Sequence, residues 1–454
     1  MWGRSPQIKE DYSCVILTTE QVLALATDSM SAAAARKLAH PRDWRTLGRS
    51  DIALWGECQG SALYQVRVHL PDTTVKCSCP SRKFPCKHAL ALMLIAAGQP
   101  ELVPAAEPPP WVGEWLAHRV RAIERREQKP KKASPPDAEA QARRAGLRLE
   151  RVREGIEALD LWMHDLVRSG LATIEVAGSS PWEAQAARLV DAQASGLASR
   201  LRGMSGLTRA TPDWAGELLA DLGRLALLTH AFGRIDDLDA PLRADVRQLV
   251  GWSLKEEEVV AAGDLVEDDW LVLGQFVDED ERFRVQRTWL KGIRSRRVAM
   301  VLQFAAGMAP FGDTFAPATH FEATLAFWPS AFPLRALVHV RQMVAVAWHD
   351  RLPGSDSFAA FLLDAARALG RQPWLGRLLC VVRDVIPVIG QNERWSLVDR
   401  DRAVIPLGGT GTWSLLAISG GHPIDVAAEW DGRALRPLFA SAWAERITWS
   451  RPAT

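Results

Sequence analysis

The sequence has no long apolar run and no strong excess of charge of either sign. A membrane-spanning helix needs about 20 predominantly apolar residues, and no such run occurs. The formal net charge is only +1, so the chain as a whole lacks the basic excess that by itself indicates a nucleic-acid binder. The first residues, Met1 to Gln7, lack the basic start and apolar segment of a secretory signal. We therefore expect a cytoplasmic protein with no membrane partner.

Cysteine is also scarce. Six cysteines occur in 454 residues, and Cys14, Cys58 and Cys380 are scattered, which fits a reducing compartment. Cys58 lies on the approach to the cysteine-rich stretch described next. We interpret it as a packed thiol rather than a metal ligand, because a complete ligand set follows without it.

The other three cysteines fall close together. Cys77, Cys79, Cys86 and His88 form the pattern Cys-x-Cys-x6-Cys-x-His. Three cysteines and one histidine are a standard closed ligand set for structural zinc, with no position left for a substrate. Residues two apart on a strand share a face, so Cys77 and Cys79 can reach one metal ion. Ordinary cysteines or disulfide partners are the alternatives, but Cys-x-Cys is a poor spacing for a bridge. We predict one structural zinc ion.

Secondary-structure signals on both sides of this pattern predict a small ββα unit with its core at 62–98. Ala62 to Leu70 and Val75 to Cys79 are expected to pair as a hairpin. The apolar residues from Ala89 to Ala97 are good helix formers, and Gly98 ends the helix. His69 lies near the site, but with four better-spaced ligands present we interpret it as a surface strand residue.

The pattern, the order strand-loop-helix and the apolar final helix resemble a SWIM-type zinc finger. The string from Leu54 to Ser61, followed by Cys77 to His88, is similar to bacterial proteins known by that finger alone, and the resemblance covers roughly Trp44 to Gly98. It implies zinc binding and an interaction role, with DNA or a protein as partner, and it implies no catalytic activity. Bacterial proteins that this one resembles tend to neighbour MoxR-type ATPases and von Willebrand A-domain proteins, so an AAA ATPase is a candidate protein partner.

The rest of the chain predicts a multidomain α+β protein. We expect N-terminal helices and the finger at 1–100, with Trp44 to Trp55 as a connector. A Pro-rich, charged linker follows at 101–136, and then a helical domain at 137–262. In the helical domain, a stripe from Ala138 to Leu166 could seed a dimeric coiled coil, but its alanine-rich start favours one face of an intramolecular bundle. Further helices are expected at Pro181 to Met204, Asp213 to Phe232 and Asp239 to Leu249, the last with Asp239 as its cap.

The last segment, 263–454, predicts an α+β domain with a mainly antiparallel sheet. Its expected strands are Trp270 to Val277, Phe283 to Leu290, Arg297 to Phe304, His320 to Trp328, Trp395 to Ile405, Thr412 to Ser419 and Ile424 to Phe439. A helical stretch from about Pro333 to Ile386 is expected between them. Asp278 to Glu281 form an acidic turn after the first strand.

Two functions of different classes remain open, and we favour the first. In the first, basic residues around the finger neutralise nucleic-acid phosphates, so that the protein is a DNA-binding module; these residues are Lys76, Arg82, Lys83 and Lys87. In the second, the finger and exposed tryptophans form a protein-interaction adaptor. An enzyme is not expected, because no set of nucleophile, base and orienting group is visible in the sequence. The sequence leaves the oligomeric state open.

Overall fold

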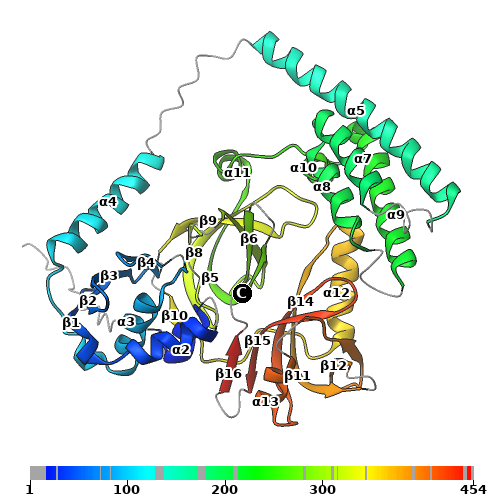
Figure 1. Cartoon of the computed structure of the whole chain (residues 1–454). Coiled ribbons are helices and arrows are strands. Elements are labelled where there is room, and N and C mark those ends of the chain that lie inside the picture. Colours follow the sequence, from blue (N-terminus) through cyan, green and yellow to red (C-terminus); the bar gives the residue numbers. More distant parts are fainter. Residues whose placement is uncertain are drawn as a thin grey trace, which may run out of the picture.

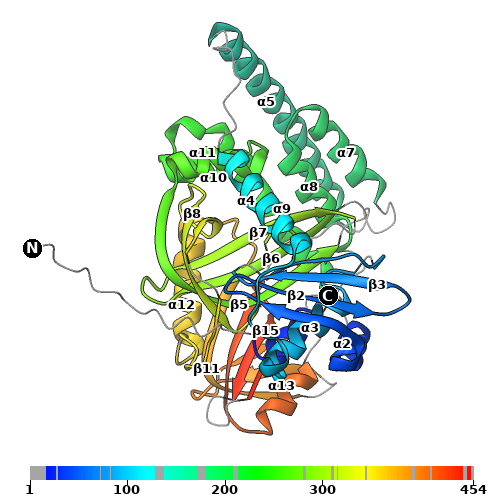
Figure 2. The ribbon, with the colours of Figure 1, turned by 90° about the vertical axis from the view of Figure 1, so that its left-hand side faces the viewer.

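The computed structural model describes residues 17–450 with gaps at 27–28, 72, 82, 128–137, 172–178, 208–212, 280–282, 308–310, 314, 343–344, 391–393, 410–411 and 443–446. An N-terminal module, a helical bundle, a β-barrel and a C-terminal sheet follow one another along the chain (Figure 1). Seen from the side, the N-terminal sheet lies in front of the barrel (Figure 2). In the part of the chain that the structure describes, no helix is long and apolar enough to span a membrane.

The N-terminal module packs one sheet against three helices. α1 (Thr19–Ala24) and α2 (Ser29–Leu38) precede an antiparallel sheet in the order β1-β2-β3-β4. Its strands are β1 (Trp44–Arg49), β2 (Ala53–Gln59), β3 (Leu63–His69) and β4 (Thr74–Cys77). α3 (Lys87–Gly98) is apolar all round because it lies between α1, α2 and this sheet, where Leu90 and Leu92 are fully buried.

The expectation of a connector at Trp44 to Trp55 is wrong, because these residues form β1 and the start of β2. Gly48 within this stretch and Gly56 just after it make room for tryptophan rings. A Cβ atom on Gly48 would lie 2.6 Å from the Trp55 indole, and one on Gly56 would lie 2.7 Å from the Trp44 indole. The space that a side chain would take at each glycine is therefore filled by a neighbouring indole, and Trp44 and Trp55 are buried.

α4 (Pro110–Glu127) extends from the N-terminal module (Figures 1 and 2). Val112 packs in a small core with Ala53 and Trp55. Arg67 of β3 holds the start of α4, since its guanidinium stacks on the Trp111 ring and donates to the Trp111 carbonyl at 2.6 Å. Residues 110–127 of the expected linker are thus helical, and the start of this helix packs on the N-terminal module, whereas 128–137 lie outside the described residues.

The helical bundle consists of α5 (Ala138–Ser169), α7 (Ser180–Asp191), α8 (Ser195–Met204), α9 (Trp214–Gly233) and α10 (Ala240–Val250). The stripe on α5 turns inward, with Val152, Ile156 and Leu159 in the bundle core, as an intramolecular bundle requires. Asp239 caps α10 by accepting from the Leu242 amide, as predicted.

The expectation of a single helix from Pro181 to Met204 is wrong, because the helix is interrupted between α7 and α8. Gln193 takes a left-handed conformation at φ +63°. The Ala194 amide then donates to the Leu189 carbonyl at 2.8 Å, which is the hydrogen bond of a Schellman helix end. Neither glycine nor proline marks this end in the sequence.

After α11 (Glu256–Ala262) the chain forms a barrel. β5 (Asp264–Glu279), β6 (Phe283–Gly292) and β7 (Val298–Ala306) are an antiparallel meander. β8 (Thr319–Phe327) pairs with β5, and β9 (Arg335–Arg341) pairs with both β8 and β7, which closes the barrel. β10 (Val346–Ala347) pairs antiparallel with the start of β8. Large side chains fill the interior, among them Trp270, Phe315, Phe321 and Phe327.

The C-terminal sheet has the order β13-β12-β11-β14-β15-β16. These strands are β11 (Leu378–Ile389), β12 (Trp395–Val398), β13 (Val404–Pro406), β14 (Ile424–Trp430), β15 (Leu435–Ala442) and β16 (Ile447–Ser450). α12 (Phe358–Arg371) packs on β11, and α13 (Thr412–Ser419) packs on β11, β15 and β16. Among the described residues, each pair of neighbouring strands in this sheet is antiparallel, whereas β9 of the barrel runs parallel to β7.

Two expectations about 263–454 are wrong. The stretch expected to be helical holds β9, β10 and β11 as well as α12, and the expected strand Thr412–Ser419 is helix α13. Short apolar runs fit a buried strand and a buried helix equally well, so periodicity does not separate them. Asp278 and Glu279, expected to begin the acidic turn, are the last two residues of β5, and 280–282 lie outside the described residues.

Buried polar contacts join these parts. The Gln21 side chain donates to the Ala318 carbonyl at 2.8 Å, which fixes α1 to the loop before β8. Between barrel and C-terminal sheet, the fully buried Glu429 of β14 accepts hydrogen bonds from Arg287 and Trp289 of β6. A Cβ atom on Gly274 of β5 would lie 2.7 Å from Leu438 of β15, so the two sheets are in close contact here.

Candidate metal centre

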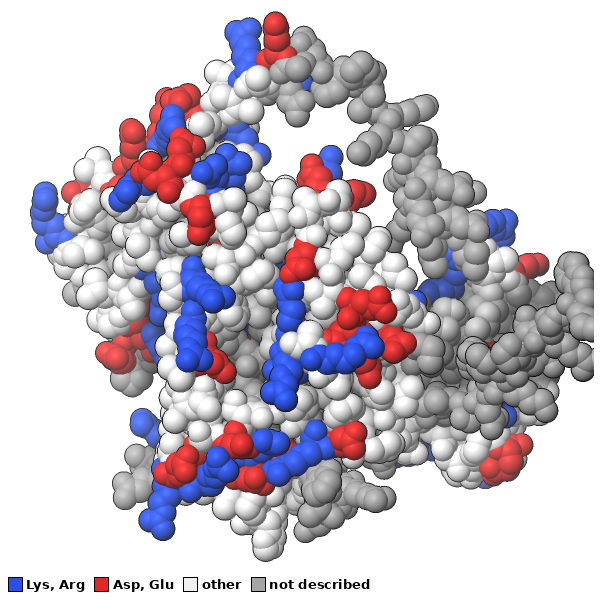
Figure 3. All heavy atoms as spheres, turned by 180° about the vertical axis from the view of Figure 1, so that it is seen from behind, with Lys and Arg blue, Asp and Glu red and all other residues white. Residues whose placement is uncertain are grey.

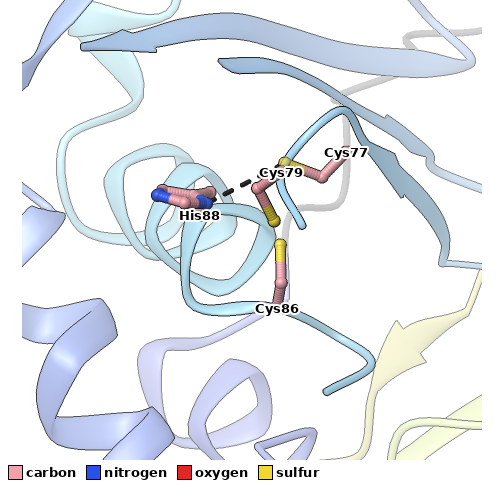
Figure 4. Close-up of side chains that lie close together, drawn as sticks. All are labelled: Cys77, Cys79, Cys86 and His88. Carbon is pink, nitrogen blue, oxygen red and sulfur yellow. Dashed lines mark hydrogen bonds between the residues drawn. The ribbon is translucent and has the colours of Figure 1, made fainter. Parts of the chain in front are cut away.

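The four predicted ligands come from two adjacent elements of the N-terminal module. Cys77 is the last residue of β4 and Cys79 follows two positions later, while Cys86 is the N-cap of α3 and His88 lies in its first turn. One potential ligand atom from each side chain lies within 4.8 Å of the others (Figure 4). Cys77 Sγ is 3.9 Å from Nδ1 of His88. A single ion can therefore be reached by all four side chains.

Local hydrogen bonds explain why the two β4 ligands face the helix. Ser78 continues the ladder past β4, because its amide donates to the Gln65 carbonyl at 3.0 Å and its hydroxyl accepts from the Gln65 amide at 2.9 Å. With Ser78 turned toward β3 in this way, Cys77 and Cys79 project on the other side. Cys86 and His88 are buried, whereas Cys77 and Cys79 are half-buried.

Comparisons with known proteins agree with this geometry. The family model described as SWIM zinc finger matches residues 64–97. This segment is a SWIM zinc finger. A second family model, described as SWIM-associated four-helix bundle domain, matches residues 147–250, which contain most of α5 and all of α7 to α10. No curated protein and no solved structure matches the chain.

The donor set of the SWIM finger fits one structural zinc ion. Three sulfur atoms and one imidazole nitrogen are soft or borderline donors, and together they fill a tetrahedral coordination shell. Before a metal binds, the thiols share protons. The pKa of Cys86 is lowered to about 4, chiefly because the Cys77 thiol donates a hydrogen bond to its sulfur. The pKa of Cys77 is raised, chiefly by the same hydrogen bond. Zinc replaces the shared protons when it binds.

A contact that sequence reasoning missed supports the histidine ligand. The ring of Tyr64 on β3 lies against the ring of His88, with centroids 4.8 Å apart. Tyr64 alternates with Val66 and Val68 along β3, so all three share the strand face toward α3. Its role beside a metal ligand depends on the docking of α3 across that face.

The other predicted residues take different places. Lys76, Lys83 and Lys87 are exposed around the SWIM finger, while Arg82 and Cys14 lie outside the described residues. Cys58 is fully buried in the module core, and burial raises the pKa of its thiol to about 11. His69 is half-buried beside Trp115. Neither Cys58 nor His69 belongs to the group of potential ligands.

Proposed function

We propose that the SWIM finger is a zinc-stabilised nucleic-acid-binding module that contacts DNA phosphates through Lys76, Lys83 and Lys87, with Arg82 as a further contact. The observation that carries this proposal is the exposure of these three lysines next to a structural metal site. Lys76 lies in β4, Lys83 in the loop that follows and Lys87 at the start of α3, so a zinc ion held by ligands from these segments would fix all three. Such preorganisation reduces the loss of side-chain and loop freedom on binding.

The charge around the finger supports the same conclusion. Residues 73–100 contain Lys76, Arg82, Lys83 and Lys87 and no aspartate or glutamate. Zinc with three thiolates carries a charge of about minus one, which leaves a local excess of about three positive charges. On the face of the protein shown in Figure 3, acidic and basic side chains are interspersed instead. Because the net charge of the chain is +1, phosphate attraction must come from such local excess.

We further propose that the protein is not an enzyme. A closed set of three cysteines and one histidine leaves no coordination position for a water molecule or a substrate. The chemistry of this centre is therefore that of a structural site. The finger contributes a surface and its rigidity, which are the properties that a binding module needs.

Binding to a fluorescent 20-base-pair DNA duplex, measured by anisotropy over a range of salt concentrations, tests the proposal. In the variant Lys76→Gln/Lys83→Gln/Lys87→Gln we expect weaker binding and a slope of log K against log salt that is less steep by about 2 to 3, because each phosphate contact contributes about 0.9. The control Arg36→Gln/Lys37→Gln/Arg45→Gln removes the same charge from exposed positions of α2 and β1. Equal slopes in the two variants would refute the proposal.

A protein-interaction adaptor is the second candidate, and one observation favours it. Trp413 of α13 is 68% exposed, and its ring packs edge-on against Trp395 of β12. Exposed tryptophans are frequent anchors of protein interfaces. The resemblance suggests an AAA ATPase as the protein partner. In this case the affinity for the partner would depend little on salt, and Trp413→Ala would lower that affinity. Exposed Leu363→Ala on α12 is the matched control.

A further inference from the structure

The connectivity of β5 to β9 is that of a known class of barrel. β5 pairs with β6 and β8, and β6 pairs with β7, all antiparallel. β9 runs parallel to β7 and antiparallel to β8. This is the Greek-key arrangement of the OB barrel, in which the face of the second and third strands binds oligonucleotides or oligosaccharides. The corresponding strands here are β6 and β7. Because a fold alone does not determine function, a binding role has to be argued from the side chains on this face.

The outward face of β6 and β7 is covered at one end and open at the other. At the covered end, Trp289 donates to Glu429 of the C-terminal sheet at 2.9 Å. Further along, Val285 of β6 lies opposite Phe304 of β7. The side chain of Phe304 is 60% exposed, and those of Val285 and Leu302 are half-buried. An aromatic ring is therefore presented to solvent on the strand that corresponds to the binding face of an OB barrel.

Arginines lie beside this open end. Phe276 of β5 occupies the neighbouring row, and the guanidinium carbons of Arg287 and Arg436 lie 5.1 and 5.5 Å from its ring centroid. Arg287 is neutralised, since it forms ion pairs with Asp278 and Glu429. Among the described residues, no carboxylate lies within ion-pair distance of Arg436. Arg436 is half-buried and contributes positive charge at the edge of the aromatic surface.

We propose that this surface, the Phe304 strip, binds single-stranded nucleic acid; it consists of Phe276, Val285, Leu302 and Phe304. A base stacks on the exposed Phe304 ring, and the phosphates pass over Phe276 on the side of Arg436. Asp278 lies across Val285 in the row of Phe304, where its carboxylate is paired with Arg287. Stacking on an aromatic ring beside a positive charge is how single strands are held without sequence preference. Because paired bases are stacked within a duplex, a duplex does not offer the base face that Phe304 needs. The strip is separate from the SWIM finger and does not depend on the function proposed for it.

The test uses the full-length protein and a fluorescent oligonucleotide of 20 thymidines, with anisotropy as the readout at low salt. In Phe304→Ala we expect the dissociation constant to rise about tenfold, since a stacked base contributes about 1–3 kcal/mol. Phe304→Tyr, which keeps the ring, should bind nearly as well as the wild type. Leu265→Ala removes a side chain that is 48% exposed elsewhere on β5 and should have no effect. Thermal unfolding and zinc content confirm that each variant is folded.

Several outcomes would overturn the proposal. If the wild type does not bind the thymidine oligonucleotide, the Phe304 strip is not a nucleic-acid site, and an apolar peptide becomes its occupant. If Phe304→Ala binds as well as Leu265→Ala, any single-strand binding takes place elsewhere. The finger variant Lys76→Gln/Lys83→Gln/Lys87→Gln separates the two proposals, because it should lower duplex binding and leave the difference between wild type and Phe304→Ala on single strands intact.

Discussion

The Tyr64 ring lies 4.8 Å from the His88 ring, between centroids, and is inclined to it by 33°. The phenol hydroxyl contacts the Ser61 hydroxyl at 2.7 Å, in an exposed position at the other end of the ring. The aromatic ring of Tyr64 therefore holds the imidazole in place, while its hydroxyl group contacts the adjacent turn.

Removing this ring should weaken the zinc site without removing a ligand. In Tyr64→Ala we expect the affinity for zinc to fall by about tenfold or more, as is usual when groups that orient a metal ligand are lost. Competition with a chromophoric chelator measures the affinity. Tyr64→Phe keeps the ring and should bind zinc like the wild type. If it loses as much affinity as Tyr64→Ala, the hydroxyl group and not the ring supports His88.

Cysteines inside and outside the metal group should respond differently to substitution. Cys86→Ser is expected to abolish stoichiometric zinc binding and to unfold the SWIM finger, because structural zinc contributes folding free energy. Cys58→Ala should keep one zinc per chain, since Cys58 lies outside the group of potential ligands. Metal analysis of the purified proteins checks both. Loss of zinc in Cys58→Ala would assign a ligand role to the thiol that we interpret as packed.

Burial of Cys58 should make the stability of the module sensitive to alkaline pH. Its pKa is raised from 9.0 to about 11, mainly by burial. Between these values the unfolded chain loses the thiol proton while the folded chain keeps it. The contribution to stability is therefore complete below pH 9.0 and declines as the pH rises to about 11. In denaturant unfolding, the free energy of unfolding should fall more steeply between these pH values for the wild type than for Cys58→Ala. Parallel pH profiles for the two proteins would contradict the expectation.

Gly274 should not tolerate a side chain. Its φ of +143° is rarely adopted by other residues, and a Cβ atom there would lie 2.7 Å from Leu438. We expect Gly274→Ala to lower the free energy of unfolding by about 1–3 kcal/mol. Gly223 in α9 is exposed, with no heavy atom within 4 Å of an added Cβ. Gly223→Ala should therefore stabilise the protein by about 0.5–1 kcal/mol. Thermal or denaturant unfolding distinguishes these opposite signs.

The zinc site could be predicted from the sequence because its ligands lie close together in the chain. Ligands that lie within a stretch as short as Cys77 to His88 specify the metal by their type and spacing. The same holds for Asp239, whose capping role requires only the amide of Leu242 three residues on. The bundle could be predicted for a related reason, since the apolar residues that α5 turns toward the core recur at a regular spacing along one helix.

Features that depend on contacts between residues far apart in the sequence could not be predicted. Glycine is typical of loops, but Gly48 lies in a strand because the Trp55 indole occupies the space where a side chain would be. The apolar run of β11 fits a helix until β12 and β14 pair with it on either side. The position of Phe304 on a barrel face depends on the return of β9 to β7 and β8. Hydrophobic periodicity carries no information about such pairings.

The closure of the barrel by β9 also sets an order for its completion during synthesis. β7 ends at Ala306 and β8 at Phe327, but the strand that joins them begins only at Arg335. Until that strand has left the ribosome, β7 has an open edge with unpaired amides and carbonyls, which invites pairing with other chains. Fragments that stop before Arg335 should therefore aggregate, and expression of this region as a separate unit should include the segment through Arg341.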